Sequence, residues 1–345
     1  LCLNTNSSGF YASPDSLYLT WGAPDNVTLV HKISLGEDGP EYRGSGQVPG
    51  YIGTGNPAFL MSESGSDLRV ISSLWTAQPE PFAQDDAEVD AGADFGPHRL
   101  TVLRENPQGT ELEQLAQIPS ASQPANIGKP GEQVFAARFL GDRAYIVTFE
   151  LIDPLYVIDL SEPSEPRISG ELELPGFSTL LQPLGENLLL GVGQAVPPEA
   201  EGLAQGIKVA LFDVADIEAP LELGSEVIGR RGSHSPALNN HHTLTIQALE
   251  GNYRVALPIA RHAHPGDTSA DPADLSRWYD WSDSGLYLFE ITPATGSLSL
   301  HDTLQVDERV DAMPWPQVGL YNARSVIHDE AVFLVSEERI WAREW

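Results

Sequence analysis

Residues 134–174 read VFAARFLGDRAYIVTFELIDPLYVIDLSEPSEPRISGELEL, a stretch in which four short apolar runs alternate with turn signals. The runs are Val134–Leu140, Ala144–Leu151, Leu155–Leu160 and Arg167–Leu174, and they are rich in Val, Ile, Phe and Tyr. Gly-Asp, Asp-Pro and Pro-Ser-Glu-Pro separate them, which predicts antiparallel strands joined by tight turns. A four-stranded unit of about 40–50 residues is typical of a β-propeller blade.

The same pattern recurs on both sides of this stretch. FSTLLQPLGENLLLGVGQ and GIKVALFDVADIEAPLELGSEVIG repeat it directly downstream. We predict an all-β fold, a β-propeller of four-stranded antiparallel blades, with five full blades and a partial sixth in a single domain over residues 1–345. The sixth unit, YNARSVIHDEAVFLVSEERIWAREW, lacks an outer strand. An open edge exposes unpaired backbone groups, so we expect residues 1–5, or better a longer upstream segment, to complete it.

Three insertions interrupt the strand pattern, at residues 76–96, 194–206 and 262–283. The first is acidic and rich in Pro and Ala, and the third is polar and aromatic. These two fall between a second and a third strand, which predicts loops on one face of the disc. Long loops on a rigid scaffold are where binding sites concentrate.

The charge balance argues against several partners. The chain has 49 acidic and 19 basic residues, a net charge of −30. Such a surface repels nucleic acid and anionic lipid. We interpret the charge as solubility in a salty or extracytoplasmic medium, with binding of cations or a cationic partner as the alternative.

Cysteine usage and hydropathy add two further limits. The single cysteine, Cys2, excludes an internal disulfide but leaves pairing with another chain or a missing segment open. No stretch of 18 apolar residues is present, so we expect no membrane insertion. The chain opens at Leu1 without a start methionine or signal peptide, so we interpret it as a processed or truncated product.

Two stretches, 131–194 and 207–238, resemble a family of secreted bacterial and archaeal proteins with a C-terminal β-propeller distantly related to WD40 repeats. The motif DPLYVIDLSEPSEP followed by LPGFS carries the likeness, which extends roughly from Ser8 to Trp345. The resemblance implies a secreted or periplasmic propeller with further blades upstream, seven or eight in an intact protein. It implies no reaction.

Three arginines form one candidate ligand site. Arg138 and Arg324 occupy equivalent places in their units, and Arg69 lies on the matching part of the second unit. Arginines repeated on innermost strands would converge on the central channel and hold a carboxylate, sulfate or phosphate through bidentate contacts. In the alternative interpretation each arginine pairs with a nearby acid, such as Asp142, Asp67 or Asp329, and ties adjacent blades together.

A second candidate is the aromatic run Arg-Trp-Tyr-Asp-Trp in the third insertion. Trp278, Tyr279 and Trp281 are unusually dense for a loop and suit a sugar-, peptide- or protein-binding patch. The alternative is packing that holds a long loop down.

Metal motifs are weak. His262 and His264 would share one strand face, but a zinc site needs further ligands, and the nearby aspartates lack a recognised spacing. Adjacent His241 and His242 would begin a strand and point to opposite faces. The acidic run Asp85–Asp94 fails as an EF-hand, because its sixth and twelfth positions hold Ala and Pro. We expect no cofactor, with an irregular calcium site as the alternative.

Catalytic motifs are also missing. The run YIGTGNPA is followed by strand-like residues where a phosphate-binding loop needs a helix. There is no Gly-x-Ser-x-Gly and no His-Glu-x-x-His, and sequence does not test a serine triad built from distant residues. We therefore expect an extracytoplasmic binding or scaffolding propeller without catalytic activity, whose partner is a protein, peptide or carbohydrate. The alternatives are a secreted hydrolase or lyase with its active site at the channel mouth, and a cation-dependent surface structural protein.

Overall fold

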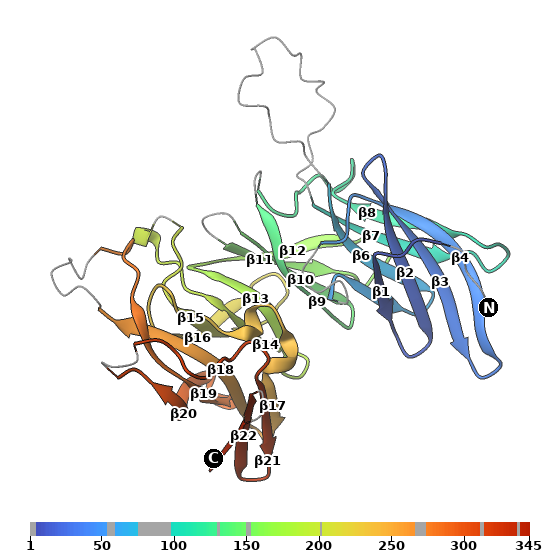
Figure 1. Ribbon diagram of the computed structural model, residues 1–345. Helices are drawn as coiled ribbons and strands as arrows, with labels where there is room; N and C mark the ends of the chain where they lie inside the picture. Colours follow the sequence, from blue (N-terminus) through green and yellow to red (C-terminus); the bar gives the residue numbers. More distant parts are fainter. Residues whose placement is uncertain are drawn as a thin grey trace. The chain divides into compact units, whose positions relative to one another are not determined.

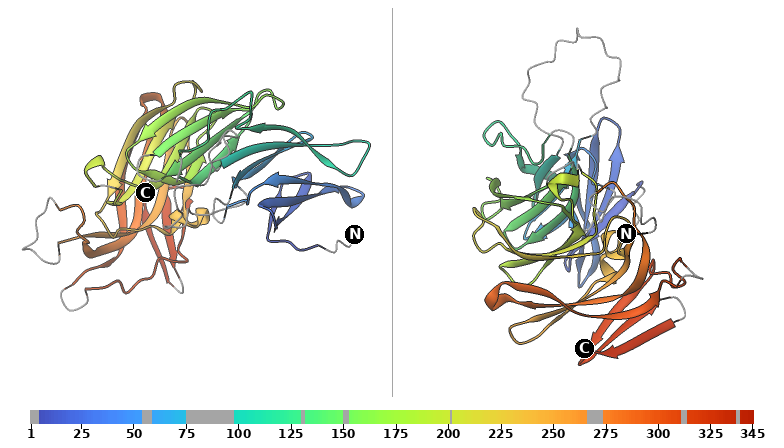
Figure 2. Two further views of the ribbon diagram at one scale, coloured as in Figure 1. Left: turned by 90° about the horizontal axis from the view of Figure 1, so that it is seen from above. Right: turned by 90° about the vertical axis from the view of Figure 1, so that its left-hand side faces the viewer.

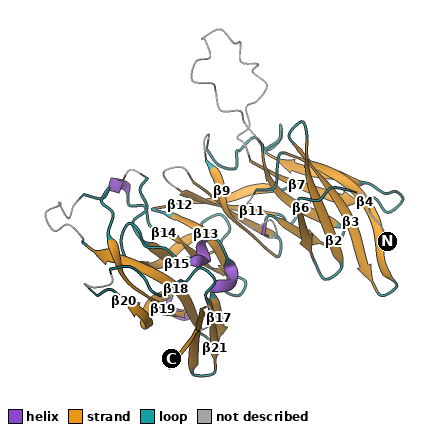
Figure 3. Cartoon of the chain, in the orientation of Figure 1, coloured by secondary structure: helices purple, strands orange, loops and turns teal. Residues whose placement is uncertain are grey.

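The computed structural model describes residues 5–53, 59–74, 98–129, 132–149, 153–200, 202–265, 274–310, 314–336 and 339–345. It is all-β, with five four-stranded sheets and one three-stranded sheet, and in each sheet the strands follow one another in chain order (Figure 3). The named helical elements are short 3-10 turns, η2 (Pro198–Ala200), η3 (Pro236–Leu238), η4 (His241–Thr243) and η5 (Pro293–Thr295). The predicted fold class is confirmed.

The chain divides into two compact units, residues 1–148 with 156–170, and residues 149–155 with 171–345. The first two sheets lie within the first unit, and most of the third sheet belongs to it (Figure 1). Their strands are β1 (Gly9–Ala12), β2 (Ser16–Ala23), β3 (Val27–Gly36) and β4 (Gly39–Pro49); β5 (Met61–Ser64), β6 (Asp67–Ser73), β7 (His98–Glu105) and β8 (Leu112–Ile118); β9 (Gln133–Leu140), β10 (Arg143–Phe149), β11 (Asp153–Asp159) and β12 (Arg167–Leu174).

Strand β6 shows how the first unit is held together. Every residue of Asp67–Ser73 is buried, because a sheet packs on each of its faces. Alternate residues of a strand point to opposite faces. Leu68 and Val70 accordingly join Tyr18 and Val30 in a core with the first sheet, whereas Ile71 joins a second core with the third sheet.

The second unit contains the remaining three sheets (Figure 2). Their strands are β13 (Phe177–Pro183), β14 (Leu188–Gln194), β15 (Ile207–Asp213) and β16 (Leu221–Ile228); β17 (Thr245–Ala248), β18 (Tyr253–His264), β19 (Asp280–Thr292) and β20 (Ser297–Glu308); β21 (Arg324–His328), β22 (Ala331–Ser336) and β23 (Arg339–Glu344). Leu286, Leu288, Val332 and Leu334 form the core between the last two sheets.

The strands expected in residues 134–174 are β9 to β12, with bounds that shift by two residues at most. The partial sixth unit is also confirmed, since β21–β23 form a three-stranded sheet. The segments 194–206 and 262–283 both fall between the second and third strands of their sheets, and residues 75–97 lie outside the described residues.

The third insertion is shorter than predicted. Strand β18 continues through His264, and β19 begins at Asp280. The cross-strand pairs His262 with Trp281 and His264 with Asp280 extend the ladder beyond two bulges. Adjacent His241 and His242 were expected to begin a strand but lie in η4 instead, where Asn240 caps the turn by accepting a hydrogen bond from the His242 amide.

Candidate functional site

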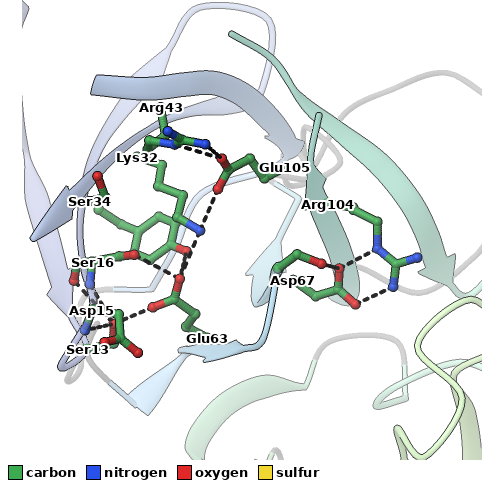
Figure 4. A network of polar contacts seen from close by, with 12 residues as sticks. Ser13, Asp15, Ser16, Lys32, Ser34, Arg43, Glu63, Asp67, Arg104 and Glu105 are labelled. Atoms are coloured by element: carbon green, nitrogen blue, oxygen red, sulfur yellow. Dashed lines mark hydrogen bonds and ion pairs between the residues drawn. The ribbon is translucent and has the colours of Figure 1, made fainter. Parts of the chain in front are cut away.

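The most extensive buried polar cluster among the described residues joins the first two sheets (Figure 4). The Lys32 amino group lies 3.0 Å from Glu63 Oε1 and 2.9 Å from Glu105 Oε2. Tyr18 donates to Glu63 Oε1 at 2.7 Å, and Arg43 Nε donates to Glu105 at 2.8 Å.

The charges in this cluster stabilise one another. Burial favours the neutral forms of Lys32 and Glu63. Hydrogen bonds to Glu105 and Glu63 outweigh burial for Lys32, and hydrogen bonds from Ser13, Tyr18 and Lys32 outweigh it for Glu63. The pKa of Lys32 is therefore raised and that of Glu63 lowered. Since each charged group already has a partner, we interpret this cluster as a structural link between the sheets.

Arg69 acts as a clamp between the second and third sheets. It lies on β6, the second strand of its sheet, whereas the sequence predicts the innermost strand, which is the first strand of a propeller blade. It donates from Nη1 to the Gly141 carbonyl and from Nη2 to Ser62 Oγ, both at 2.7 Å, and stacks 5.2 Å from the Phe139 ring centre. Asp67 does not pair with Arg69, because Arg104 binds both of its oxygens.

Arg138 and Arg324 do lie on the first strands of their sheets, β9 and β21. Their positions are not equivalent, however. The two hairpins align at Gly141 and Asp329, which share a left-handed backbone, and Arg138 precedes its turn by three residues while Arg324 precedes its turn by five. Arg138 stacks on Phe59 at 4.5 Å, and Arg324 donates to the Ala323 carbonyl. The two arginines belong to different units.

A serine–histidine contact is buried near the end of β6. Ser73 Oγ lies 2.8 Å from His98 Nδ1, and His98 Nε2 lies 2.9 Å from the Glu132 carbonyl oxygen. A carbonyl only accepts, so Nε2 carries the proton and Nδ1 accepts from Ser73. Burial lowers the pKa of His98, which keeps the ring neutral. The imidazole is 2% exposed with both nitrogens occupied, so we interpret it as a structural contact.

The second unit carries a cluster of a different kind, which we call the arginine–aromatic cluster: Arg230, Arg231, Arg277, Trp278 and Tyr279. The Arg231 guanidinium lies 4.9 Å from the Trp278 ring centre. Tyr279 has the Arg277 guanidinium at 5.2 Å and that of Arg230 at 6.0 Å. Stacking on rings suits the planar, weakly hydrated guanidinium.

Two glycines shape the turn that presents these arginines. Gly229 and Gly232 have left-handed backbones, with φ of +78° and +112°. A Cβ on Gly232 would lie 2.8 Å from His262 Nδ1, so only glycine lets the turn approach β18 this closely. The His262 Nδ1 in turn lies 2.8 Å from the Tyr279 carbonyl, and the Tyr279 amide donates to the Arg231 carbonyl. The turn and the aromatic segment are thus fixed to each other.

Two arginines of the cluster, Arg230 and Arg231, form no ion pair with the described residues, whereas Arg277 interacts with the Asp274 carboxylate. Arg230 and Arg231 have no carboxylate within 4 Å in the described part of the chain, whereas the nearby Arg261 and Arg309 pair with Asp283 and Asp280. The Arg231 Nε atom is buried and has no hydrogen-bond partner in that part. This is the local excess of cationic groups that an anionic ligand requires.

The three predicted aromatic residues do not all reach this surface. Trp278 is 67% exposed and Tyr279 is half-buried. Trp281 is 4% exposed, because its side chain packs into the core near the start of β19. Its indole N–H donates to Ser284 Oγ at 3.1 Å. A further exposed indole, Trp315, follows Pro314, whose carbonyl accepts from Arg309 at 2.8 Å.

The described residues of the two units contain no cluster of potential metal ligands. Among the residues that the structure describes, no three His, Cys, Asp or Glu side chains lie close enough to hold an ion. His264 is exposed and 4.0 Å from Asp280. The acidic run Asp85–Asp94 lies outside the described residues.

Residues 1–345 match the family model for the beta propeller domain over their full length. The chain belongs to this β-propeller domain family. Two uncharacterized archaeal proteins are similar to parts of it. That from Methanocaldococcus jannaschii is 38% identical over 135 residues, 39% of this chain and 20% of the relative. That from Archaeoglobus fulgidus is 40% identical over 120 residues, 35% of this chain and 18% of the relative. The matched stretches thus span a fifth or less of each relative.

Solved structures similar to this β-propeller domain include a Lactobacillus plantarum protein, with a TM-score of 0.44, 11% identity, and coverage of 98% of this chain and 82% of that one. The β-propeller domain of the trilobed protease from Pyrococcus furiosus gives a TM-score of 0.38 at 9% identity, covering 98% of this chain and 84% of that one.

Arg230 and Arg231 are functional-site candidates of this β-propeller domain that the sequence motifs above do not include. They form the only adjacent pair of basic residues in a chain with 19 basic residues. Flanking glycines, in Gly-Arg-Arg-Gly, mark a turn that displays them. The pair was detectable, but its contact with residues 277–279 depends on how two distant loops meet.

Proposed function

We propose that this chain is an extracytoplasmic binding module without catalytic activity, and that it holds its partner on the arginine–aromatic cluster. The observation that carries the proposal is the pairing of two exposed or half-exposed arginines with aromatic rings, with no carboxylate beside Arg230 or Arg231 among the described residues. Aromatic and arginine side chains are the residue types that dominate binding energy at interfaces. The partner is a protein, peptide or carbohydrate.

Two further features support this proposal. Two buried titratable groups of the first unit are closed: Lys32 lies between two carboxylates, and His98 has both ring nitrogens occupied. A catalytic group needs access to substrate. The placement outside the cytoplasm is supported by the strongly acidic composition. Among the described residues, no helix has the length and apolarity needed to cross a bilayer.

The proposal is tested by immobilising the chain and its Trp278→Ala variant and applying a defined panel of polysaccharides and peptides. Arg339→Ala, which removes an exposed arginine from β23 in the same unit, is the matched control. We expect at least one ligand to bind the parent chain and the control but not Trp278→Ala, and to elute chemically unchanged. Equal binding by all three proteins, or recovery of cleaved products, would contradict the proposal and favour the hydrolase or lyase alternative.

A further inference from the structure

We propose that the ligand of the arginine–aromatic cluster is an acidic polysaccharide, a polymer of sugar rings that carry carboxylate groups. This inference rests on the proposed function and names the ligand class for the same site.

The side chains provide two kinds of contact in one place. Arg230 and Arg231 offer planar guanidinium forks, which match carboxylates with paired hydrogen bonds. Trp278, which is 67% exposed, offers apolar ring surface beside Arg231. A ligand that uses both needs a flat, partly apolar face and an anionic group close to it. A sugar ring with a carboxylate has both in a single residue.

The local main chain disfavours an extended peptide. Peptides that bind by strand addition need free backbone donors and acceptors. Around the cluster these groups are already used: the Arg230 amide donates to the His262 carbonyl at 2.7 Å, and the Tyr279 amide donates to the Arg231 carbonyl at 3.1 Å. With these two amides occupied, we expect recognition to proceed through the rings and guanidinium groups.

A second exposed indole, Trp315, is linked to the segment next to the cluster through Arg309. Arg309 joins the loop after β20 to the start of β19, because its Nη2 lies 3.4 Å from Asp280 Oδ2 and its Nη1 donates to the Pro314 carbonyl at 2.8 Å. Trp315, 67% exposed, follows directly. Each of the two segments that Arg309 connects thus carries an exposed indole, Trp278 on one and Trp315 on the other, and we expect a polymer of several sugar units to use both.

The net charge of −30 would oppose any polyanion at long range. Ions at about 0.15 M screen exposed charges beyond roughly 8 Å, so a bound carboxylate would interact mainly with the local arginines. The acidic remainder of the surface would still repel densely charged polymers such as nucleic acid. We therefore expect selectivity for a carboxylated polymer that also offers ring faces for stacking.

The test is titration calorimetry of the full chain with oligogalacturonate at 0.15 M salt, alongside neutral dextran, dextran sulfate and polyglutamate. We expect oligogalacturonate to bind most tightly. Arg231→Lys keeps the charge but loses the fork, so we expect affinity to fall about tenfold, the effect of losing about 1.4 kcal/mol. Trp278→Ala should weaken binding comparably, and Arg339→Lys should leave it unchanged.

Each other outcome overturns a stated part of the account. Equal binding of polyglutamate and oligogalacturonate would show that charge alone decides, and tighter binding of dextran sulfate would show a preference for sulfate; either overturns the carboxylated-sugar inference. Trp278-dependent binding of neutral dextran or of a peptide would overturn the inference while leaving the proposed binding function intact. Binding of oligogalacturonate that none of the variants changes would overturn both. Failure of every polymer to bind overturns the inference, and the panel experiment above then decides the proposed function.

Discussion

The guanidinium of Arg231 lies 4.9 Å from the ring centre of Trp278, although the two residues stand 47 positions apart in the chain. Arg231 belongs to the turn that follows β16, and Trp278 to the segment that precedes β19. The contact therefore joins two loops: the connection from β16 to the next sheet, and the loop between β18 and β19 within that sheet. It forms the centre of the surface that we propose as the binding site.

Replacing Lys32 should strongly destabilise the first unit. Lys32→Ala would leave Glu63 and Glu105 buried beside each other without their shared cation, a change that typically costs about 3–5 kcal/mol of unfolding free energy. Arg167→Ala is the control, because its ion pair with Asp159 involves a side chain that is 55% exposed and is expected to contribute less than about 1 kcal/mol. Urea unfolding measures both, and similar losses in the two variants would contradict the structural role of the cluster.

The stability of the first unit should fall on acidification below about pH 6.5, the ordinary pKa of histidine. Burial lowers the pKa of His98 in the folded state. The unfolded chain then binds a proton that the folded chain does not, so unfolding becomes more favourable as pH falls through the unfolded pKa. Stability measured from pH 7 to pH 5 should fall less steeply in His98→Gln than in the parent chain. Parallel slopes would mean that His98 is not held neutral.

Arg69 should contribute to stability and not to binding. Arg69→Lys removes the two-pronged contact with Gly141 and Ser62, and we expect a loss of about 1–3 kcal/mol, typical of hydrogen bonds to charged groups. Calorimetric titration of the same variant with oligogalacturonate should give the parent affinity. A change in affinity with unchanged stability would restore the arginine ligand site that the sequence predicts.

Gly193 on β14 should not tolerate a methyl group. A Cβ there would lie 1.7 Å from the Phe177 carbonyl oxygen, so Gly193→Ala should cost about 1–3 kcal/mol through forced backbone shifts. Gly22 on β2 has nothing within 4 Å of the same position, and Gly22→Ala should be neutral or stabilising by about 0.5 kcal/mol. Thermal unfolding of the two variants makes the comparison, and equal melting temperatures would show that β13 and β14 approach less closely.

The strands were predictable because their apolar pattern and turn residues are local signals. These local signals explain why the strands predicted in residues 134–174 agree with β9–β12. Arg69 was assigned to the wrong strand because β5, at four residues, is too short to be separated from β6 by pattern alone. The cross-strand pair of His262 with Trp281 likewise depends on bulges, which the sequence does not mark, and it places Trp281 in the core.

The candidate site was only half predictable. The density of aromatic residues at 277–281 indicated a binding surface, and Trp278 and Tyr279 do lie in the cluster. The place of Arg230 and Arg231 in the cluster depends on the packing of their turn against His262, which the structure shows. Contacts between loops that are distant in the sequence are determined by the fold and not by local sequence.

The central claim is tested most directly by a crystal structure of the chain with bound trigalacturonate. We predict a carboxylate in paired hydrogen bonds, at about 2.8 Å, with the Arg230 or Arg231 guanidinium, and a sugar ring stacked on Trp278. Binding at any place that leaves the arginine–aromatic cluster empty would contradict the account.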